Sequence, residues 1–113
     1  IEIEQAGLRL GVSTHSYWEL ARALAVNPSY IALGPVFETT SKIMPWIPQG
    51  VERVQQWTKL LGDTYPLVAI GGIDQDRAEQ LYKTGVGSVA MISAITKAKD
   101  YKKVTKDLLT LWQ

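Results

Sequence analysis

Two glycines and a serine, each placed just after an apolar segment, have the types and spacing of a phosphate-binding site. Gly71 and Gly72 follow Pro66–Ile70, and Ser93 follows Ser88–Ile92. Glycine lets the backbone approach an anion closely, and the N-terminus of a helix, predicted after each segment, favours negative charge. This arrangement is typical of the phosphate site formed by the last two strand–helix loops of a (β/α) barrel. The sequence therefore predicts binding of a phosphorylated small molecule.

The elements that must position these residues alternate between helix and strand. Short apolar segments predict four strands, at Leu8–Ser13, Tyr30–Gly34, Pro66–Ile70 and Ser88–Ile92. Capping residues or apolar spacing predict helices before Gly7, after Ser16, over Val51–Leu61, and after Asp74 and Asp100. Strands that are apolar on both faces and alternate with helices indicate a parallel sheet with covered faces. Right-handed crossovers would bring the loops after the strands to one rim, with Ser13, Thr39–Lys42, Gly71–Gly72 and Ser93.

The number of units is half that of a closed barrel. A TIM (β/α)8 barrel has eight strands and usually more than about 200 residues, whereas this chain has 113 residues. The predicted fold class is therefore α/β, with residues 1–113 as a single partial domain of four βα units. Two strand edges would be open. The missing half would precede Ile1, which is not a methionine, or a second copy or a partner would supply it. An open four-stranded α/β sandwich is the alternative.

Composition excludes several classes of protein. The chain is 46% apolar and 20% charged with a net charge of +1, as in ordinary globular proteins. The lack of a basic excess argues against nucleic acid as a partner. No apolar run is long enough to span a membrane and no signal peptide is visible, so we expect a cytoplasmic protein. The lack of cysteine excludes disulfides, thiolate chemistry and zinc–sulfur sites.

Five segments of the chain occur in the same order in a known enzyme family. They are Gly11–His15; Tyr30–Phe37; Thr39–Lys42 with Met44–Pro45 and Pro48–Gly50; Val68–Ile73; and Gly85–Ile95. On these segments the chain, from about Ala6 to Lys97, resembles the C-terminal half of thiamine phosphate synthase (thiamine-phosphate pyrophosphorylase). The resemblance implies that the four units are the C-terminal half of a TIM barrel.

The resemblance also implies a reaction, the transferase step of thiamine biosynthesis. Hydroxymethylpyrimidine pyrophosphate loses pyrophosphate, assisted by one Mg²⁺ per active site, and the nitrogen of thiazole phosphate attacks the resulting cation. Such a site must stabilise a departing anion and hold two planar rings in register. The family's magnesium-ligand aspartates lie in the missing N-terminal half, and no aspartate here matches them. We therefore expect the fragment alone to be inactive.

Roles for individual residues follow from the same resemblance. Ser13 and Lys42 would contact the pyrimidine pyrophosphate and are the candidate catalytic residues. Thr39, Thr40 and Ser41 would hold the thiazole substrate, especially its carboxylate form. The thiazole phosphate itself would be bound by Gly72, Ile92 and Ser93.

Other interpretations remain open at this point. A related family, the thiazole tautomerases, uses a histidine at the place of His15 for proton transfer, so an isomerase is one alternative. A non-catalytic phosphate-binding half barrel is another. Asp74 and Ser93 could simply cap helices, and Lys42 could be a solvated loop charge. Three tryptophans are predicted to pack helices onto the sheet, namely Trp18, Trp57 and Trp112.

Overall fold

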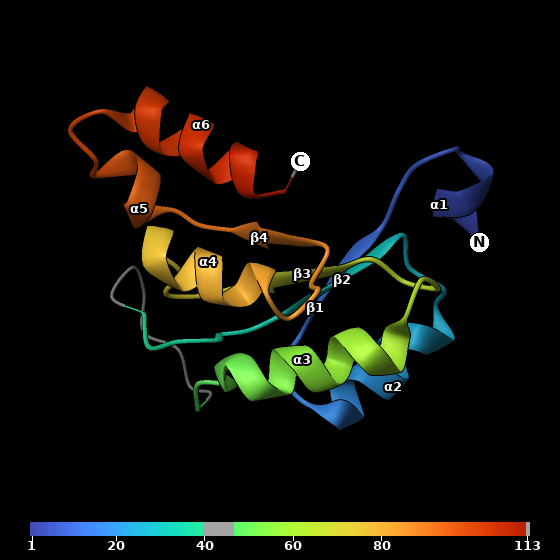
Figure 1. Cartoon of the computed structure of the whole chain (residues 1–113). Helices are drawn as coiled ribbons and strands as arrows, with labels where there is room; N and C mark the ends of the chain where they lie inside the picture. The colour runs from blue at the N-terminus through green and yellow to red at the C-terminus, as the bar shows by residue number, and fades with distance from the viewer. Residues whose placement is uncertain (40–46, 113) are drawn as a thin grey trace.

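Four parallel strands form one sheet in chain order, β1-β2-β3-β4 (Figure 1). They are β1 (Gly11–Thr14), β2 (Tyr30–Leu33), β3 (Leu67–Ile70) and β4 (Ser88–Ala90). The computed structural model describes residues 1–39 and 47–112. The predicted site residues Thr40, Ser41 and Lys42 lie outside the described residues. The α/β class and the parallel sheet predicted from the sequence are confirmed.

Six helices accompany the strands in the described part of the chain. They are α1 (Glu2–Gln5), α2 (Tyr17–Ala25), α3 (Gly50–Leu61), α4 (Gln75–Tyr82), α5 (Ser93–Thr96) and α6 (Tyr101–Leu111). The three predicted caps are confirmed, because the side chains of Ser16, Asp74 and Asp100 each accept a backbone hydrogen bond at the start of their helix. The helix start predicted after Ser88–Ile92 is present as the short α5. None of these helices has the length and apolarity that crossing a membrane requires.

The first strand begins later than the sequence predicts. Leu8 is exposed, and the chain joins the sheet only at Leu10, whose N–H donates to Ser29 Oγ at 2.9 Å. The carbonyl oxygen of Leu10 accepts from the N–H of Ser29 at 2.7 Å. The ladder proper then starts with Gly11 opposite Tyr30. The prediction rested on apolar character and therefore included Leu8, which has no residue of β2 opposite it.

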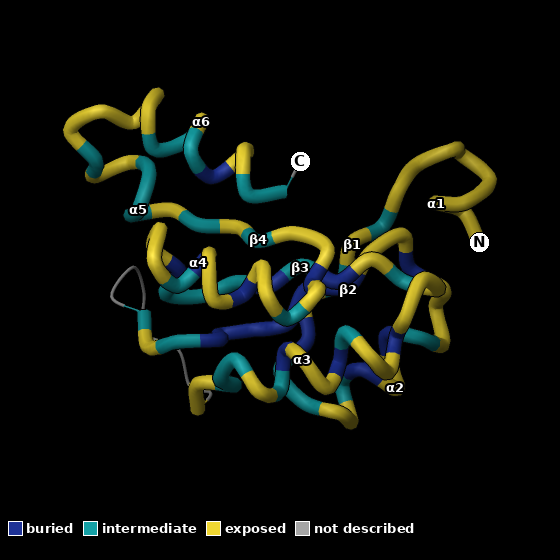
Figure 2. The backbone as a smooth tube through the Cα atoms, viewed as in Figure 1, coloured by how far each residue is buried: buried dark blue, intermediate teal, exposed yellow. Residues whose placement is uncertain are grey.

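The core lies between one face of the sheet and the helices. Consecutive parallel strands joined by right-handed crossovers place α2, α3 and α4 on the same face. On that face the register aligns Thr14, Leu33 and Ala69, and all three are buried. Figure 2 shows buried backbone along β2 and on the helices that cover this face. The hydroxyl of Thr14 donates to the carbonyl oxygen of Ala32 at 2.8 Å, which satisfies a buried polar group. Trp57 of α3 is 0% exposed and packs into this core, as predicted.

The prediction that every strand is covered on both faces is wrong for the edge strands. Gly11 and Ser13 of β1, and Ser88 and Ala90 of β4, are exposed. These positions belong to the sheet face opposite the helices, because side chains alternate along a strand. The sheet therefore presents one open face and two unpaired edges among the described residues.

The other two tryptophans have different environments. Trp18 is 68% exposed and lies under the guanidinium of Arg22, at 4.9 Å from the ring centroid, so its predicted packing onto the sheet is wrong. Trp112 is half-buried, donates its indole N–H to the carbonyl oxygen of Val86 at 3.1 Å, and packs edge-on against Tyr82. Trp112 therefore connects the end of α6 to the strand region, as predicted.

We predict that residues 1–113 on their own do not form a stable monomer. The open edges leave backbone N–H and C=O groups unpaired beside apolar side chains, which promotes pairing with a second copy. Sedimentation of the isolated polypeptide at micromolar concentration should show dimers or aggregates. A compact monomer that unfolds cooperatively would contradict this expectation and would favour a complete small sandwich.

Candidate functional site

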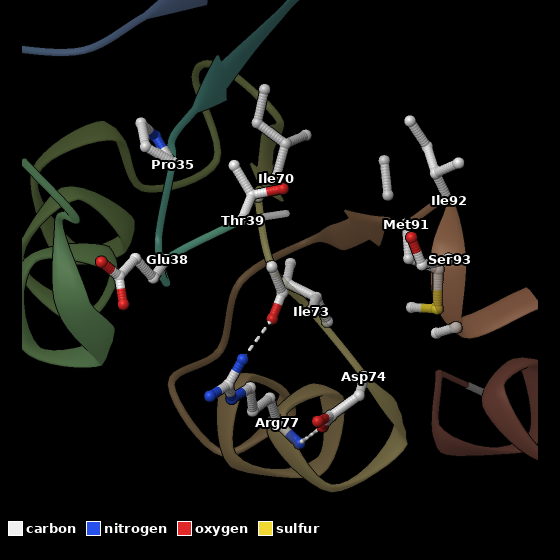
Figure 3. Close-up of a pocket in the computed structure, with 14 residues that line it drawn as sticks. Pro35, Glu38, Thr39, Ile70, Ile73, Asp74, Arg77, Met91, Ile92 and Ser93 are labelled. Atoms are coloured by element: carbon white, nitrogen blue, oxygen red, sulfur yellow. Dashed lines mark hydrogen bonds between the residues drawn. The ribbon is translucent and has the colours of Figure 1, made fainter. Parts of the chain in front are cut away.

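A cavity of about 610 Å³ opens at the carboxyl ends of β3 and β4 (Figure 3). Three segments line it: the loop after β2, the turn from β3 into α4, and the end of β4 with the start of α5. The lining residues are Pro35, Glu38, Thr39, 70–74, Arg77 and 90–94. Parallel strands end at the same edge of a sheet, which is why loops far apart in the sequence meet here.

The structure brings together some of the residues predicted for the site. The lining includes Thr39, Gly72, Ile92 and Ser93. Ser13 lies elsewhere, as an exposed residue of β1 that pairs with Ala32, and it does not line this cavity. Four of the six residues that the sequence analysis assigned to the thiazole substrate or its phosphate thus share one cavity, while the other two, Thr40 and Ser41, lie outside the described residues.

Both glycines after β3 adopt a backbone conformation that favours glycine. Gly71 has φ +100° and Gly72 has φ +65°. A Cβ on Gly71 would lie 2.6 Å from the Cα of Pro35, and one on Gly72 would collide with the carbonyl oxygen of Glu38. The sequence analysis assigned these glycines to close approach of an anion. The structure adds a second reason for glycine, namely the close approach of the loop after β2.

Arg77 is a residue of the cavity that the sequence analysis missed. Its Nη1 donates to the carbonyl oxygen of Gly72 at 2.8 Å, and its guanidinium carbon lies 4.6 Å from the centroid of the Phe37 ring. Figure 3 shows the guanidinium below the turn, reaching up to Gly72. The signal that could have found it is local: an arginine in the first turn of a helix whose N-cap, Asp74, follows a glycine pair by two residues.

The two predicted helix caps at the cavity behave differently. Asp74 is the N-cap of α4, and its Oδ1 accepts from the backbone N–H of Arg77 at 2.9 Å. For α5 the N-cap position is Ile92, with no side-chain cap, and Ser93 is the first helical residue. The interpretation of Ser93 as a cap is therefore wrong, whereas that of Asp74 is confirmed.

The wall of the cavity is apolar, with polar groups at its edges. Ile70, Ile73, Met91 and Ile92 supply aliphatic and thioether surface. Such a wall suits a planar ring, while backbone amides, a hydroxyl and a guanidinium suit a polar substituent. Among the described residues, no three histidine, aspartate or glutamate side chains are grouped to hold a metal ion.

His15 is held at the opposite end of the rim by the start of α2. Its Nδ1 lies 2.9 Å from Glu19 Oε1, and its backbone N–H donates to Glu19 Oε2 at 3.1 Å. Its carbonyl oxygen accepts from Gln49 Nε2 at 2.6 Å. The Glu19 side chain thus contacts His15, the residue before Ser16, which is the N-cap of α2. These contacts give His15 a structural role that ties β1 to α2 and α3.

Comparison with known proteins decides the family. The family model described as Thiamine monophosphate synthase matches residues 1–95. The chain belongs to this family. That match contains all four cavity residues predicted from the sequence, and it also contains Arg77.

Relatives of this family cover nearly the whole chain. Thiamine-phosphate synthase from Citrobacter koseri is 56% identical over 109 residues, which are 96% of this chain and 51% of the relative. The protein of the same name from Neisseria meningitidis is 52% identical over 110 residues, 97% of this chain and 53% of the relative. Thiamine phosphate pyrophosphorylase from Pyrococcus furiosus, a solved structure, is 33% identical with a TM-score of 0.78, covering 97% of this chain and 52% of that one. The chain spans about half the length of these thiamine phosphate synthase relatives.

We predict that Gly72→Ala destabilises the whole protein more than a glycine substitution without a close neighbour. The left-handed conformation costs a residue with a side chain about 1–2 kcal/mol, and overlap with the Glu38 carbonyl adds about 1–3 kcal/mol. The control is Gly7→Ala, at φ +75° with nothing within 4 Å of the added Cβ. Urea unfolding would measure both. If both variants lost the same unfolding free energy, the overlap between a Cβ at position 72 and the loop after β2 would make no contribution, and the prediction would be wrong.

Proposed function

We propose that the protein containing this chain makes thiamine phosphate, joining hydroxymethylpyrimidine pyrophosphate to thiazole phosphate with release of pyrophosphate. The observation that carries the proposal is the shared cavity of Thr39, Gly72, Ile92 and Ser93 in a chain of this family. The tautomerase alternative lacks such support, since His15 is held by Glu19 outside the cavity lining, and the match to thiamine phosphate synthases disfavours a non-catalytic module.

In this proposal the cavity binds the thiazole phosphate. Its phosphate would lie against the turn at Gly72 and the start of α5 at Ser93, where the positive end of a helix dipole favours an anion. Its ring would lie on the apolar wall, beside Ile73 and Ile92. Thr39, on the loop after β2, would close the site from the other side. The ring nitrogen would then be held in one orientation toward the pyrimidine substrate.

The proposed reaction does not need a nucleophilic side chain on the protein. The attacking atom is the thiazole nitrogen, and the bond that breaks joins the pyrimidine methylene carbon to the pyrophosphate oxygen. The cavity lining has no histidine or cysteine, which agrees with such a role. Ser13 and Lys42 would bind the departing pyrophosphate, and Mg²⁺, held by ligands from the rest of the protein, would neutralise its charge. Positioning and electrostatic stabilisation would supply the rate enhancement.

We further propose that the sheet is half of a (β/α)8 barrel. Its open face, with Ser13, Ala32 and Ser88 on it, would face the barrel interior, and the rest of the protein would pair with β1 and β4. The likeness to the Pyrococcus furiosus structure over 52% of that chain supports this arrangement. The activity would then need both halves, because the pyrimidine pyrophosphate site draws on each.

The direct test is product formation by the whole protein. Purified protein, Mg²⁺ and both substrates should yield thiamine phosphate and pyrophosphate in equal amounts, detected by chromatography and a pyrophosphate assay. Omitting either substrate should abolish both products. Release of pyrophosphate without thiamine phosphate, or no reaction with both substrates present, would contradict the proposed function.

We predict that Lys42→Ala lowers turnover in the whole protein by about 10²–10³-fold, the usual effect of removing one charge-stabilising group from a water-excluded site. The KM for thiazole phosphate should change little, because Lys42 is assigned to the other substrate. The control is Lys59→Ala, an exposed lysine of α3, which should keep full turnover. Unchanged kcat in Lys42→Ala at saturating substrates would assign Lys42 to the solvated loop instead.

A further inference from the structure

Arg77 connects two of the three segments that line the cavity. Its side chain starts in the first turn of α4 and donates to the carbonyl oxygen of Gly72 in the turn after β3. The same guanidinium lies over the ring of Phe37, in the loop after β2. The guanidinium therefore makes a hydrogen bond through one N–H and a cation–π contact with the ring.

The hydrogen bond fixes a peptide plane at the proposed phosphate site. In a trans peptide the carbonyl and the following N–H point in opposite directions. With the Gly72 carbonyl held by Arg77, the N–H of Ile73 is directed to the side away from the guanidinium. Gly72 has φ +65° and, as glycine, more backbone freedom than any other residue, so its peptide needs an external restraint to keep one orientation.

The contact with the Phe37 ring holds the Arg77 guanidinium in the position from which it donates to the Gly72 carbonyl. Phe37 is half-buried, and its backbone N–H donates to the carbonyl oxygen of Gly71 at 3.1 Å, so its ring sits on a fixed part of the loop. A planar, delocalised guanidinium can stack on a ring and donate in its plane at the same time. A lysine ammonium is a point charge on a flexible stem and cannot do both.

We propose that Arg77 is a positioning residue for the thiazole phosphate: it orients the Gly72–Ile73 peptide toward the phosphate and locks the loop after β2 against the turn after β3. This inference rests on the proposed function and adds a residue to it. The competing interpretation is that Arg77 binds the phosphate directly by its charge. The two interpretations predict different results when lysine replaces Arg77, because direct binding by charge would be kept. They also differ in whether the Phe37 ring contributes to the affinity for thiazole phosphate.

The test uses the whole protein with Arg77→Met, Arg77→Lys, Phe37→Leu and the Phe37→Leu/Arg77→Met double variant. Arg77→Met should raise the KM for thiazole phosphate and its calorimetric Kd about tenfold, the usual size for a lost charged hydrogen bond. The KM for the pyrimidine pyrophosphate should stay within twofold. Arg77→Lys should be as weak as Arg77→Met, and Phe37→Leu should lie between wild type and Arg77→Met. The double variant should be no weaker than Arg77→Met alone.

The control is Arg22→Met, which removes an arginine stacked on an exposed ring, that of Trp18, away from the cavity. It should leave both KM values unchanged. Rescue by Arg77→Lys, or a Phe37→Leu effect that is absent or adds fully to that of Arg77→Met, would overturn the inference in favour of direct phosphate binding. Should Arg77→Met fail to fold, Phe37→Leu and Arg77→Lys still decide between the two interpretations.

The calorimetric measurement separates this inference from the proposed function. A wild-type protein that binds thiazole phosphate but forms no thiamine phosphate contradicts the function, while the variants still test Arg77 through their Kd values. A wild-type protein that does not bind thiazole phosphate overturns both.

Discussion

The segment Pro35–Phe37 is the constraint on which the cavity depends. On one side, Val36 donates to the carbonyl oxygen of Ile70 at 2.9 Å, extending the pairing of β2 and β3 beyond the strands. On the other, the carbonyl oxygens of Pro35 and Val36 accept from Gln49 at 2.7 Å and Gly50 at 2.8 Å, where α3 begins. The buried Val36 side chain holds the segment in the core. These hydrogen bonds fix the backbone where the chain leaves β2 and where α3 begins. As a result, Glu38 and Thr39 lie beside the turn at Gly72.

That constraint explains why there are two separate reasons for glycine at positions 71 and 72. A phosphate site built from backbone amides needs glycine for access, and the crossing of two loops needs glycine because a Cβ would meet the backbone of Pro35 or Glu38. Arg77 adds a third link between the same segments through Gly72 and Phe37. Loop packing and the proposed phosphate binding would thus be two uses of one turn, and a change at Gly72 would affect both.

Features set by neighbouring residues were predictable from the sequence, whereas those set by distant contacts were not. The caps at Ser16, Asp74 and Asp100 and the order of the strands follow from local patterns. Thr39, Gly72 and Ser93 were placed at one rim by the strand pattern, since the strand ends of a parallel sheet converge, and Ile92 was assigned through the family resemblance. The stacking of Arg77 on Phe37 and the exposure of Trp18 depend on packing between elements, which periodicity does not report. The start of β1 depends on where its partner strand β2 begins, at Tyr30.

The sequential strand order has a consequence for how the chain folds. Each strand pairs with the one just before it, so the sheet can grow unit by unit with modest loop closures. The largest closure is the pairing of Ile31 with Leu67, which encloses the long loop and α3, whereas Gly11 with Tyr30 and Val68 with Ser88 enclose much shorter segments. Joining β2 to β3 is therefore the step with the highest entropic cost. Because the cavity is built across that same junction, it forms only once the costliest closure of the sheet has been made.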